Sequence, residues 1–308
     1  MAPGSSALSQ LHIPHLLSTR DLDKHQVDYL LQRAAELEGQ NDQHLVGKIA
    51  ATLFFEPSTR TRLSFESAML RRGGGVISAT DAAVSSSSAK GESLEDTIAV
   101  VSGYADVIVL RHPQAGAAQR AAAVATVPVI NAGDGDGEHP SQALLDLHCV
   151  GRELGHIDGI HIAFCGDLKH SRTVHSLLHL LRHYRNIHVS LIAPADLLPR
   201  ADLLAELREA GVVCETVDAL TSIATDVDVV YQTRPQTERW AAPNNTTSMP
   251  QIDRRVMDRL SRHAIVMHPL PRTDEIAPEV DQDPRAAYFR QAIGGVAVRM
   301  ALLEAVLA

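Results

Sequence analysis

The stretch from Lys48 to Arg62, KIAATLFFEPSTRTR, decides the fold, because it reads as a strand, a turn and the start of a helix. The apolar run up to Phe55 is typical of a buried strand. The run stops at Pro57, and a helix is predicted to begin within Ser58–Thr61. A strand that leads through a polar turn into a helix is the repeating unit of α/β proteins with parallel sheets.

The same unit recurs along the chain. Further short apolar runs predict strands at Asp106–Leu110, Val127–Ile130, Ile160–Cys165, Ile187–Ala193, Val212–Thr216, Val227–Tyr231 and Ala264–Met267. Helical segments separate most of them, including Leu22–Leu37, Pro140–Leu154 and Val296–Leu307. We therefore expect an α/β fold of two domains, each a parallel β-sheet flanked by helices. The expected bounds are 1–145 and 146–292, with a C-terminal helix at 293–308 that packs back on the first domain.

Composition limits the class of protein. The 308 residues carry a net charge of −9, which argues against general adhesion to nucleic acid or to an anionic membrane. No apolar run approaches the ~18 residues of a membrane span, and no secretory signal is expected at the N-terminus. Three widely spaced cysteines, Cys149, Cys165 and Cys214, fit neither a disulfide framework nor a metal site, so we expect reduced thiols and a cytoplasmic location.

The turn at residues 56–62 predicts an anion site. Hydroxyl groups, free backbone N–H groups, a helix dipole and an arginine would converge there, an arrangement suited to phosphate. An ordinary Ser/Thr helix cap with solvated arginines is the alternative. Two hydroxyls and two arginines directly after a buried strand favour the anion site.

A series of motifs in fixed order identifies a resemblance. Glu56-Pro-Ser-Thr-Arg-Thr61 is followed by the motifs Ser86…Lys90-Gly-Glu, Arg111-His-Pro, His139-Pro-Ser-Gln142, Gly166-Asp-Leu with Arg172-Thr, Thr233-Arg-Pro-Gln236 and His268-Pro-Leu-Pro-Arg272. From about Leu16 onward the chain resembles the aspartate/ornithine carbamoyltransferases, and within that family the catalytic chain that uses aspartate. Ornithine enzymes typically have His-Cys-Leu-Pro at the last motif and a lysine where this chain has Glu56, so aspartate is the expected second substrate.

The resemblance implies transfer of the carbamoyl group of carbamoyl phosphate to the amine of L-aspartate, an early step of pyrimidine (UMP) synthesis. It assigns carbamoyl phosphate to Ser58, Thr59, Arg60, Thr61, Ser86, Lys90, Arg111, His139, Gln142 and the backbone of Pro269 and Leu270. Within that set, Thr61, Arg111 and His139 are the catalytic residues that polarise the carbonyl oxygen. It assigns aspartate to Lys90, Arg172, Arg234 and Gln236.

The resemblance also implies how the molecule works as a whole. Glu56 and Arg239 match a pair that bridges the two domains when aspartate binds. The loop with Ser86 and Lys90 would act in a neighbouring subunit's site, which implies a homotrimer; regulatory or dihydroorotase chains are possible partners. No cofactor or metal is expected, and no residue stands out as a general base.

Three histidines lie outside this pattern. His175, His179 and His183 recur every four residues and therefore share a helix face. A solvated or interface face is the expectation, and a metal site is the alternative that the spacing leaves open.

Rival functions are an ornithine-type carbamoyltransferase, a phosphate- or nucleotide-sensing binding protein, and an inactive scaffold protein. The chain lacks G-x-G-x-x-G and G-x-x-x-x-G-K-[ST], which counts against the binding protein. The scaffold protein is disfavoured because every motif is complete.

Overall fold

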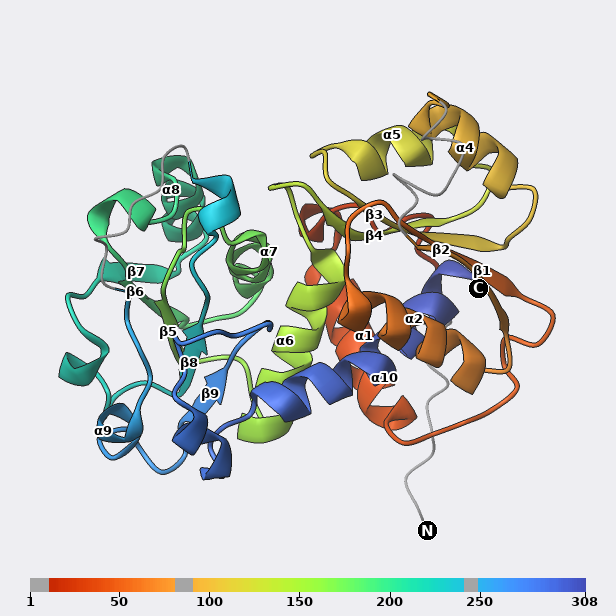
Figure 1. Cartoon of the computed structure of the whole chain (residues 1–308). Coiled ribbons are helices and arrows are strands. Elements are labelled where there is room, and N and C mark those ends of the chain that lie inside the picture. The colour runs from red at the N-terminus through yellow and green to blue at the C-terminus, as the bar shows by residue number, and fades with distance from the viewer. Residues whose placement is uncertain (1–10, 81–90, 241–248) are drawn as a thin grey trace, which may run out of the picture.

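A computed structural model describes residues 11–80, 91–240 and 249–308. It shows two α/β units side by side, with helices α6 (Pro140–Leu154) and α10 (Tyr288–Val306) between them (Figure 1). Each unit contains one sheet, and every strand pairing within the sheets is parallel. The expected fold class is therefore confirmed.

The first sheet has four strands in the order β2-β1-β3-β4. Its strands are β1 (Ile49–Phe54), β2 (Gly75–Thr80), β3 (Val107–His112) and β4 (Val129–Asp134). Its helices are η1 (Thr19–Asp21), α1 (Lys24–Leu37), α2 (Thr59–Arg71), α4 (Leu94–Val101) and α5 (Ala117–Val124). Apolar residues of α4 and α5 form one core with one face of this sheet, while α1, α2 and α10 pack on the other face.

The second sheet has five strands in the order β7-β6-β5-β8-β9. Its strands are β5 (His161–Cys165), β6 (His188–Ile192), β7 (Val213–Thr216), β8 (Val229–Gln232) and β9 (Ile265–Met267). Its helices are α7 (Arg172–Leu181), η3 (Ala195–Leu197), α8 (Ala201–Glu209), η4 (Leu220–Ser222), η5 (Thr237–Arg239), α9 (Arg254–Met257) and η6 (Pro278–Gln282). Residues of α7 and α8 cover one face, and those of α9, η4 and η6 cover the other.

Helices α6 and α10 join the two units. All residues of α6 from Pro140 to Val150 are buried, and the helix packs against α1, α7 and α10. The last helix, α10, returns from the second sheet to pack on α1, α2 and α6. As a result, one apolar core extends from the helices of the first unit to β5, β6 and β8 of the second.

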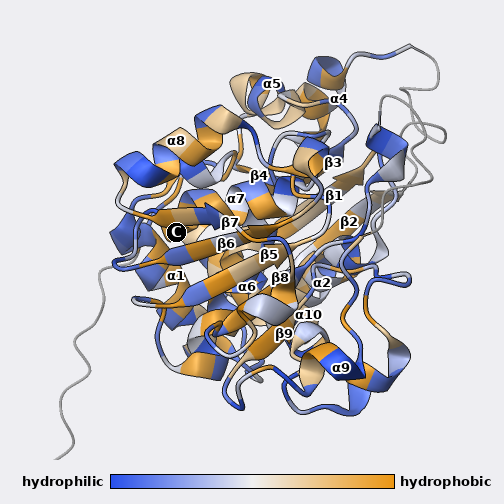
Figure 2. Ribbon diagram, turned by 90° about the vertical axis from the view of Figure 1, so that its left-hand side faces the viewer, coloured by the Kyte–Doolittle hydropathy of each residue, from blue (hydrophilic) through white to orange (hydrophobic). Residues whose placement is uncertain are grey.

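The strands carry most of the apolar character of the molecule, as the orange bands in Figure 2 show. Seven of the eight strands that periodicity located are buried along nearly their whole length and read as continuous apolar runs. The eighth, β7, is mostly exposed. The edge strand β2, whose side chains at Ile77 and Ser78 are exposed, escaped prediction. None of the helices in the described residues is long and apolar enough to span a bilayer.

Candidate active site

A cleft of about 380 Å³ lies where the carboxyl ends of the strands in both sheets face each other. The segments that follow β1, β4, β5, β8 and β9 contribute to its walls, and β3 contributes Arg111 from its carboxyl end. Parallel sheets place loops and helix N-termini at this end, where ligands bind in α/β proteins. Its polar lining includes Glu56, Ser58, Thr59, Arg60, Thr61, Arg111, His139, Gln142, Ser171, Arg172, Thr173, Arg234, Gln236, Glu238, Arg239, Gln291 and Arg299.

Three helices begin at the cleft without a side-chain cap. The N-cap residues of α2, α6 and α7 are Ser58, His139 and Ser171, and in the described structure none of these side chains accepts a bond from its own helix. By contrast, Asp23 and Ser93 cap α1 and α4 in the ordinary way. The first-turn N–H groups of the three helices are left for a ligand, which favours the anion site over an ordinary cap at Ser58.

The three residues expected to polarise a carbonyl oxygen are buried. Thr61 is 7% exposed, Arg111 9% and His139 4%. Buried polar atoms are normally paired, yet Arg111 Nε and His139 Nδ1 find no partner among the described residues. Two unpaired buried groups at the wall of a polar cleft indicate that a ligand completes the site.

Cations dominate the cleft. Six arginines (Arg60, Arg111, Arg172, Arg234, Arg239 and Arg299) line it against two carboxylates, Glu56 and Glu238. Glu56 accepts a hydrogen bond of 2.8 Å from Arg111 Nη2 and lies 3.6 Å from Arg172 Nη2. Glu56 thus partly neutralises two arginines that were predicted to bind the two substrates.

Burial and mutual repulsion shift the pKa of several of these arginines. Burial, followed by the charge of Arg111, lowers the pKa of Arg172 to about 9. Burial and Arg111 likewise lower the pKa of Arg60, and burial lowers that of Arg111. Each arginine would be stabilised as a cation by an anion between them, so the site is built for negatively charged ligands.

His139 is neutral at neutral pH. Burial lowers its pKa well below the ordinary value, and the charges of Arg172, Arg111 and Arg299 lower the pKa further. A neutral imidazole retains one N–H and can donate it to a carbonyl oxygen without carrying a proton into the reaction.

Close packing behind the arginines requires glycine at position 133. Gly133 has φ +113°, and a Cβ there would lie 3.1 Å from both Arg111 Nη1 and Arg172 Nη2. Its absence allows the guanidinium groups of Arg111, on β3, and Arg172, on α7, to lie against the same backbone.

The residues expected to bind aspartate lie on the second unit's side of the cleft. Arg172 is 6% exposed and donates to the carbonyl oxygen of Gly135, so it is part of the buried cleft wall and not a surface arginine. Arg234 does form an ion pair, with Glu238, at 3.0 Å from Nη1 to Oε2. Gln236 lines the cleft and donates from Nε2 to the Arg234 carbonyl oxygen at 3.4 Å.

Arg239 bridges the two units without contacting Glu56. It donates to the carbonyl oxygen of His170 at 2.9 Å and to that of Gly135 at 3.0 Å. In this structure Glu56 is paired with Arg111 instead. The expected Glu56–Arg239 pair is therefore a contact that the substrates would have to induce.

The loop after β9 is held in an unusual conformation. Leu270 has φ +54°, in the left-handed region that residues with a Cβ seldom occupy. His268 fixes the loop: its Nδ1 accepts from the Leu270 N–H at 2.8 Å, and its Nε2 lies 2.7 Å from Glu275 Oε1. Backbone strain of this kind persists where surrounding contacts enforce it, commonly at binding sites.

Every predicted site residue that the structure describes lines this one cleft. Ser86 and Lys90 lie outside the described residues. Sequence reasoning missed Arg299 and Gln291, both on α10, and Asp146 on α6, which lies behind the cleft wall. An arginine within the apolar sequence of the last helix was the available signal, because a buried charge needs a polar partner.

The three regularly spaced histidines do not form a solvated face. His179 is 5% exposed, and α7 packs against η1, α6 and α8. His175 Nε2 bonds to the carbonyl oxygen of Leu168 at 2.9 Å. The face is therefore an interface inside the chain. In the described part of the chain these histidines belong to no cluster of potential metal ligands.

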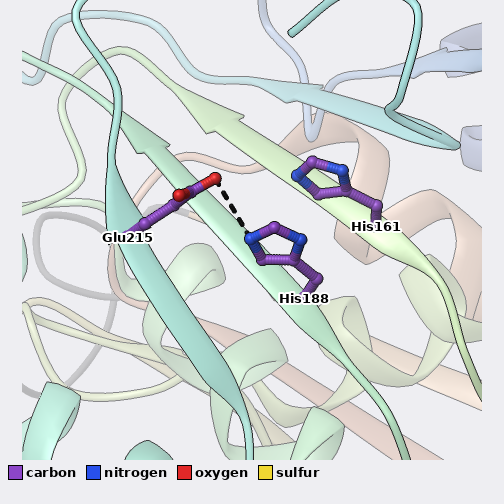
Figure 3. A group of neighbouring side chains, drawn as sticks. All are labelled: His161, His188 and Glu215. Carbon is purple, nitrogen blue, oxygen red and sulfur yellow. Dashed lines mark ion pairs between the residues drawn. The ribbon is translucent and has the colours of Figure 1, made fainter.

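A different histidine cluster lies at the opposite end of the second sheet. His161, His188 and Glu215 come from β5, β6 and β7 (Figure 3). The imidazole rings stack at 4.0 Å between centroids and 9° between planes, and His188 Nε2 lies 3.1 Å from Glu215 Oε1. A metal ion binds in the plane of each imidazole, so stacked rings do not aim their lone pairs at one ion. His161 and Glu215 are instead joined through Ser190, to whose hydroxyl both bond, at the end of the strands opposite the cleft.

Two family models cover almost the whole chain. The model described as "Aspartate/ornithine carbamoyltransferase, carbamoyl-P binding domain" matches residues 14–151. The model described as "Aspartate/ornithine carbamoyltransferase, Asp/Orn binding domain" matches residues 158–306. The chain belongs to the aspartate/ornithine carbamoyltransferase family.

Relatives in this family are similar over nearly the whole of this chain. Aspartate carbamoyltransferase 1, chloroplastic, of Pisum sativum is 46% identical over 99% of this chain and 82% of its own length. The solved catalytic subunit of Methanocaldococcus jannaschii aspartate transcarbamoylase is 46% identical, with a TM-score of 0.89 over 96% of this chain and 98% of that one. Aspartate transcarbamoylase of Trypanosoma cruzi, solved with carbamoyl phosphate and aspartate, is 41% identical with a TM-score of 0.91 over 97% of this chain and 98% of that one.

Proposed function

We propose that this chain is an aspartate carbamoyltransferase: it transfers the carbamoyl group of carbamoyl phosphate to the amine of L-aspartate, giving N-carbamoyl-L-aspartate and phosphate. The observation that carries this is a cationic cleft with three uncapped helix N-termini, lined by every described residue that the motifs assign to a substrate. Both substrates are anions, and the relatives of similar sequence are aspartate enzymes. The reaction is an early step of pyrimidine synthesis.

The proposed phosphate site is the start of α2. Ser58, Thr59, Arg60 and Thr61 supply hydroxyls, first-turn N–H groups and a guanidinium, and Ser86 and Lys90 are assigned here by resemblance. An unused N-cap hydroxyl supports this role, because Ser58 is free to bind a ligand.

The proposed carbonyl site consists of Thr61, Arg111 and His139. Their donors, held in a buried wall, would stabilise the negative charge that develops on the carbonyl oxygen as the amine attacks. Removal of one such preorganised donor costs roughly 3–4 kcal/mol of transition-state stabilisation. Gln142 and the carbonyl groups of Pro269 and Leu270 are proposed to accept from the carbamoyl amino group.

The proposed aspartate site consists of Arg172, Arg234 and Gln236, together with Lys90. Guanidinium groups bind carboxylates through two parallel bonds, so two arginines suit a dicarboxylate. Carbamoyl phosphate is already activated, so the work of the protein is to orient two substrates and stabilise charge. Orientation alone can supply on the order of 7–11 kcal/mol of the barrier.

A homotrimer with shared active sites is part of this proposal. Apolar side chains at one end of β1, β2 and α2 are exposed, including Val46 at 61% and Leu70 at 61%, and β2 is an open sheet edge. Such a surface is typical of a subunit interface. In the sequence, β2 is followed by the segment that carries Ser86 and Lys90. Analytical ultracentrifugation identifies the dilution at which the protein is a monomer, and activity should be lost at that dilution. A fully active monomer would contradict shared sites.

Regulatory or dihydroorotase chains are further proposed partners. We also propose a cytoplasmic location, which the three free thiols support.

A colorimetric assay of carbamoyl-aspartate tests the proposed function. Wild-type protein should form this product from carbamoyl phosphate and aspartate, and Arg60→Ala should lower kcat/KM by roughly a hundredfold or more. Arg255→Ala, on α9, is the matched control and should leave the rate unchanged. Ornithine replaces aspartate in a parallel assay: activity with ornithine alone would refute the choice of substrate, and full activity of Arg60→Ala would refute the site.

A further inference from the structure

A buried carboxylate lies directly behind the cleft. Asp146 is one helical turn beyond Gln142 on α6, and its exposed fraction is 0%. Its Oδ1 accepts from Gln142 Nε2 at 2.8 Å and from Gln291 Nε2 at 2.6 Å, and its Oδ2 accepts from the Tyr231 hydroxyl at 2.7 Å. Three donors from three different elements, α6, α10 and β8, thus meet on one side chain.

The hydrogen-bonding capacity of Asp146 decides how Gln142 is oriented. An amide can present either its NH₂ group or its oxygen in a given direction, but Asp146 Oδ1, which already receives two N–H donors, can only accept, whether or not Oδ2 carries a proton. Asp146 therefore holds the NH₂ group of Gln142, and the Oε1 atom is left for other partners. Gln142 lines the cleft, so this oxygen is available as an acceptor for a ligand N–H group.

The second glutamine, Gln291, links Asp146 to the loop after β9 in the same way. Because Asp146 also takes the NH₂ group of Gln291, Gln291 Oε1 is free to accept from the His268 N–H, at 2.9 Å. His268 in turn accepts from the Leu270 N–H through Nδ1. A chain of hydrogen bonds thus runs from Asp146 to the strained Pro269–Leu270 backbone.

We propose that Asp146 is a positioning residue that orients both acceptors of the carbamoyl amino group, Gln142 Oε1 directly and the Pro269–Leu270 carbonyls through Gln291 and His268. The inference rests on the function proposed above, which assigns these acceptors to carbamoyl phosphate. An NH₂ group has two hydrogens, and the cleft is lined by an acceptor for each of them. Asp146 itself touches no substrate in this account.

Charge balance is the competing explanation for a buried carboxylate at this place. Arg299 is 2% exposed, lies at the cleft, and carries a charge that favours ionised Asp146. No hydrogen bond joins Asp146 to Arg299 among the described contacts, whereas both glutamines bond to it directly. The geometry therefore favours orientation, and the two explanations differ in what they predict for an uncharged replacement.

Acetyl phosphate is the probe that distinguishes loss of the contacts to the carbamoyl amino group from a general disturbance of the binding site. It is close in shape to carbamoyl phosphate but has a methyl group in place of the amino group. Calorimetric titrations without aspartate measure the Kd of each acyl phosphate. Asp146→Ala should raise the Kd for carbamoyl phosphate about tenfold, the effect of roughly one hydrogen bond. It should change the Kd for acetyl phosphate by less than about twofold. Equal weakening of both ligands, or no weakening of either, would overturn the proposal.

Two further variants make the test specific. Asp146→Asn keeps an oxygen for the glutamines and turns its NH₂ group to the Tyr231 oxygen, so it should keep most of the preference for carbamoyl over acetyl phosphate. If Asp146→Asn loses the preference for carbamoyl phosphate as Asp146→Ala does, the preference depends on the charge of Asp146 and not on how it orients the glutamines. Tyr231→Phe is the matched control, because it removes only the bond to Oδ2 and should preserve the preference. Thermal unfolding of each variant checks that it is folded, and Asp146→Ser replaces Ala if Ala is not.

Gln142→Ala separates this inference from the proposed function on which it rests. If Gln142→Ala keeps the wild-type preference between the two acyl phosphates, Gln142 does not meet the amino group and the proposed site fails. If Gln142→Ala loses the preference while Asp146→Ala keeps it, the site stands and the inference alone fails.

Discussion

Ser58 shows what distinguishes a binding hydroxyl from a structural one. It occupies the N-cap position of α2, yet its side chain makes no capping bond, whereas Ser93 accepts from the Asp96 N–H at 3.1 Å at the start of α4. The same residue type at the same helical position therefore has two roles. Sequence spacing alone cannot separate them, because the N-cap preference is common to both.

The two serines give a prediction with a built-in control. Ser58→Ala should leave the free energy of unfolding nearly unchanged, because no capping bond is lost. It should weaken the binding of carbamoyl phosphate, because the proposed contact to the phosphate is lost. Ser93→Ala should cost about 1 kcal/mol of stability and leave substrate affinity unchanged. Urea denaturation and calorimetric titration of both variants measure the contrast. A destabilised Ser58→Ala with normal affinity would show that Ser58 is only a cap.

At the scale of single residues, the motifs brought together nearly all of the cleft. Arg111, His139, Arg172 and Arg234 lie far apart in sequence, and each follows a predicted strand, so their meeting at one edge was foreseeable. The pairing of Glu56 with Arg111 was not foreseeable, because it depends on which of several arginines lies nearest in space.

At the scale of elements, the strands with a clear apolar run were predictable and β2 was not. β1 and β5 are apolar because both of their faces are covered. β2 begins at the third of three consecutive glycines and has only partly covered side chains, so its sequence gives a weak signal. An edge position alone did not hide a strand, because the edge strands β4, β7 and β9 were predicted from their apolar sequences.

Helix α7 shows which of two expectations holds. Its histidines predicted a solvated or an interface face, and the structure shows an interface, in which burial lowers the pKa of His175 and His179. A neutral imidazole is compatible with a packed interface, and hydropathy cannot register this because it assigns histidine one fixed polarity. The last helix, α10, was expected to pack on the first domain. It does so, and it also contributes Arg299 to the lining of the cleft.

At the scale of the whole molecule, the buried histidines predict how stability depends on pH. Burial lowers the pKa of His139, His175, His179 and His268, that of His179 to about 4. The unfolded chain then binds more protons than the folded one below an ordinary histidine pKa of about 6.5, so stability is lost as pH falls from 6.5 towards 4.

Asp146 acts in the opposite sense, since burial raises its pKa to about 7 and the folded state gains a proton there. Four histidines outweigh one carboxyl, so the denaturation midpoint in urea should be lower at pH 5 than at pH 7.5. His179→Gln should reduce this difference, because it removes one of the shifted groups. An equal or higher midpoint at pH 5 would contradict the prediction.

Domain closure is the second prediction at this scale. Glu56 neutralises Arg111 and Arg172 in the structure described here, and anionic substrates would take over that role. Glu56 would then be free to pair with Arg239 across the cleft. We expect the radius of gyration in solution scattering to fall when a bisubstrate analogue binds, and Glu56→Gln to reduce the change. Scattering curves that are identical with and without the analogue would count against closure.

The return of α10 to α1, α2 and α6 has a consequence for biosynthesis. The first sheet leaves the ribosome early, but the helix that completes its apolar core is translated only after the whole second sheet. The second domain can therefore mature during translation, while the first waits with a partly uncovered surface. The nascent chain is exposed to aggregation in that interval, and chaperones would be needed chiefly for its N-terminal half.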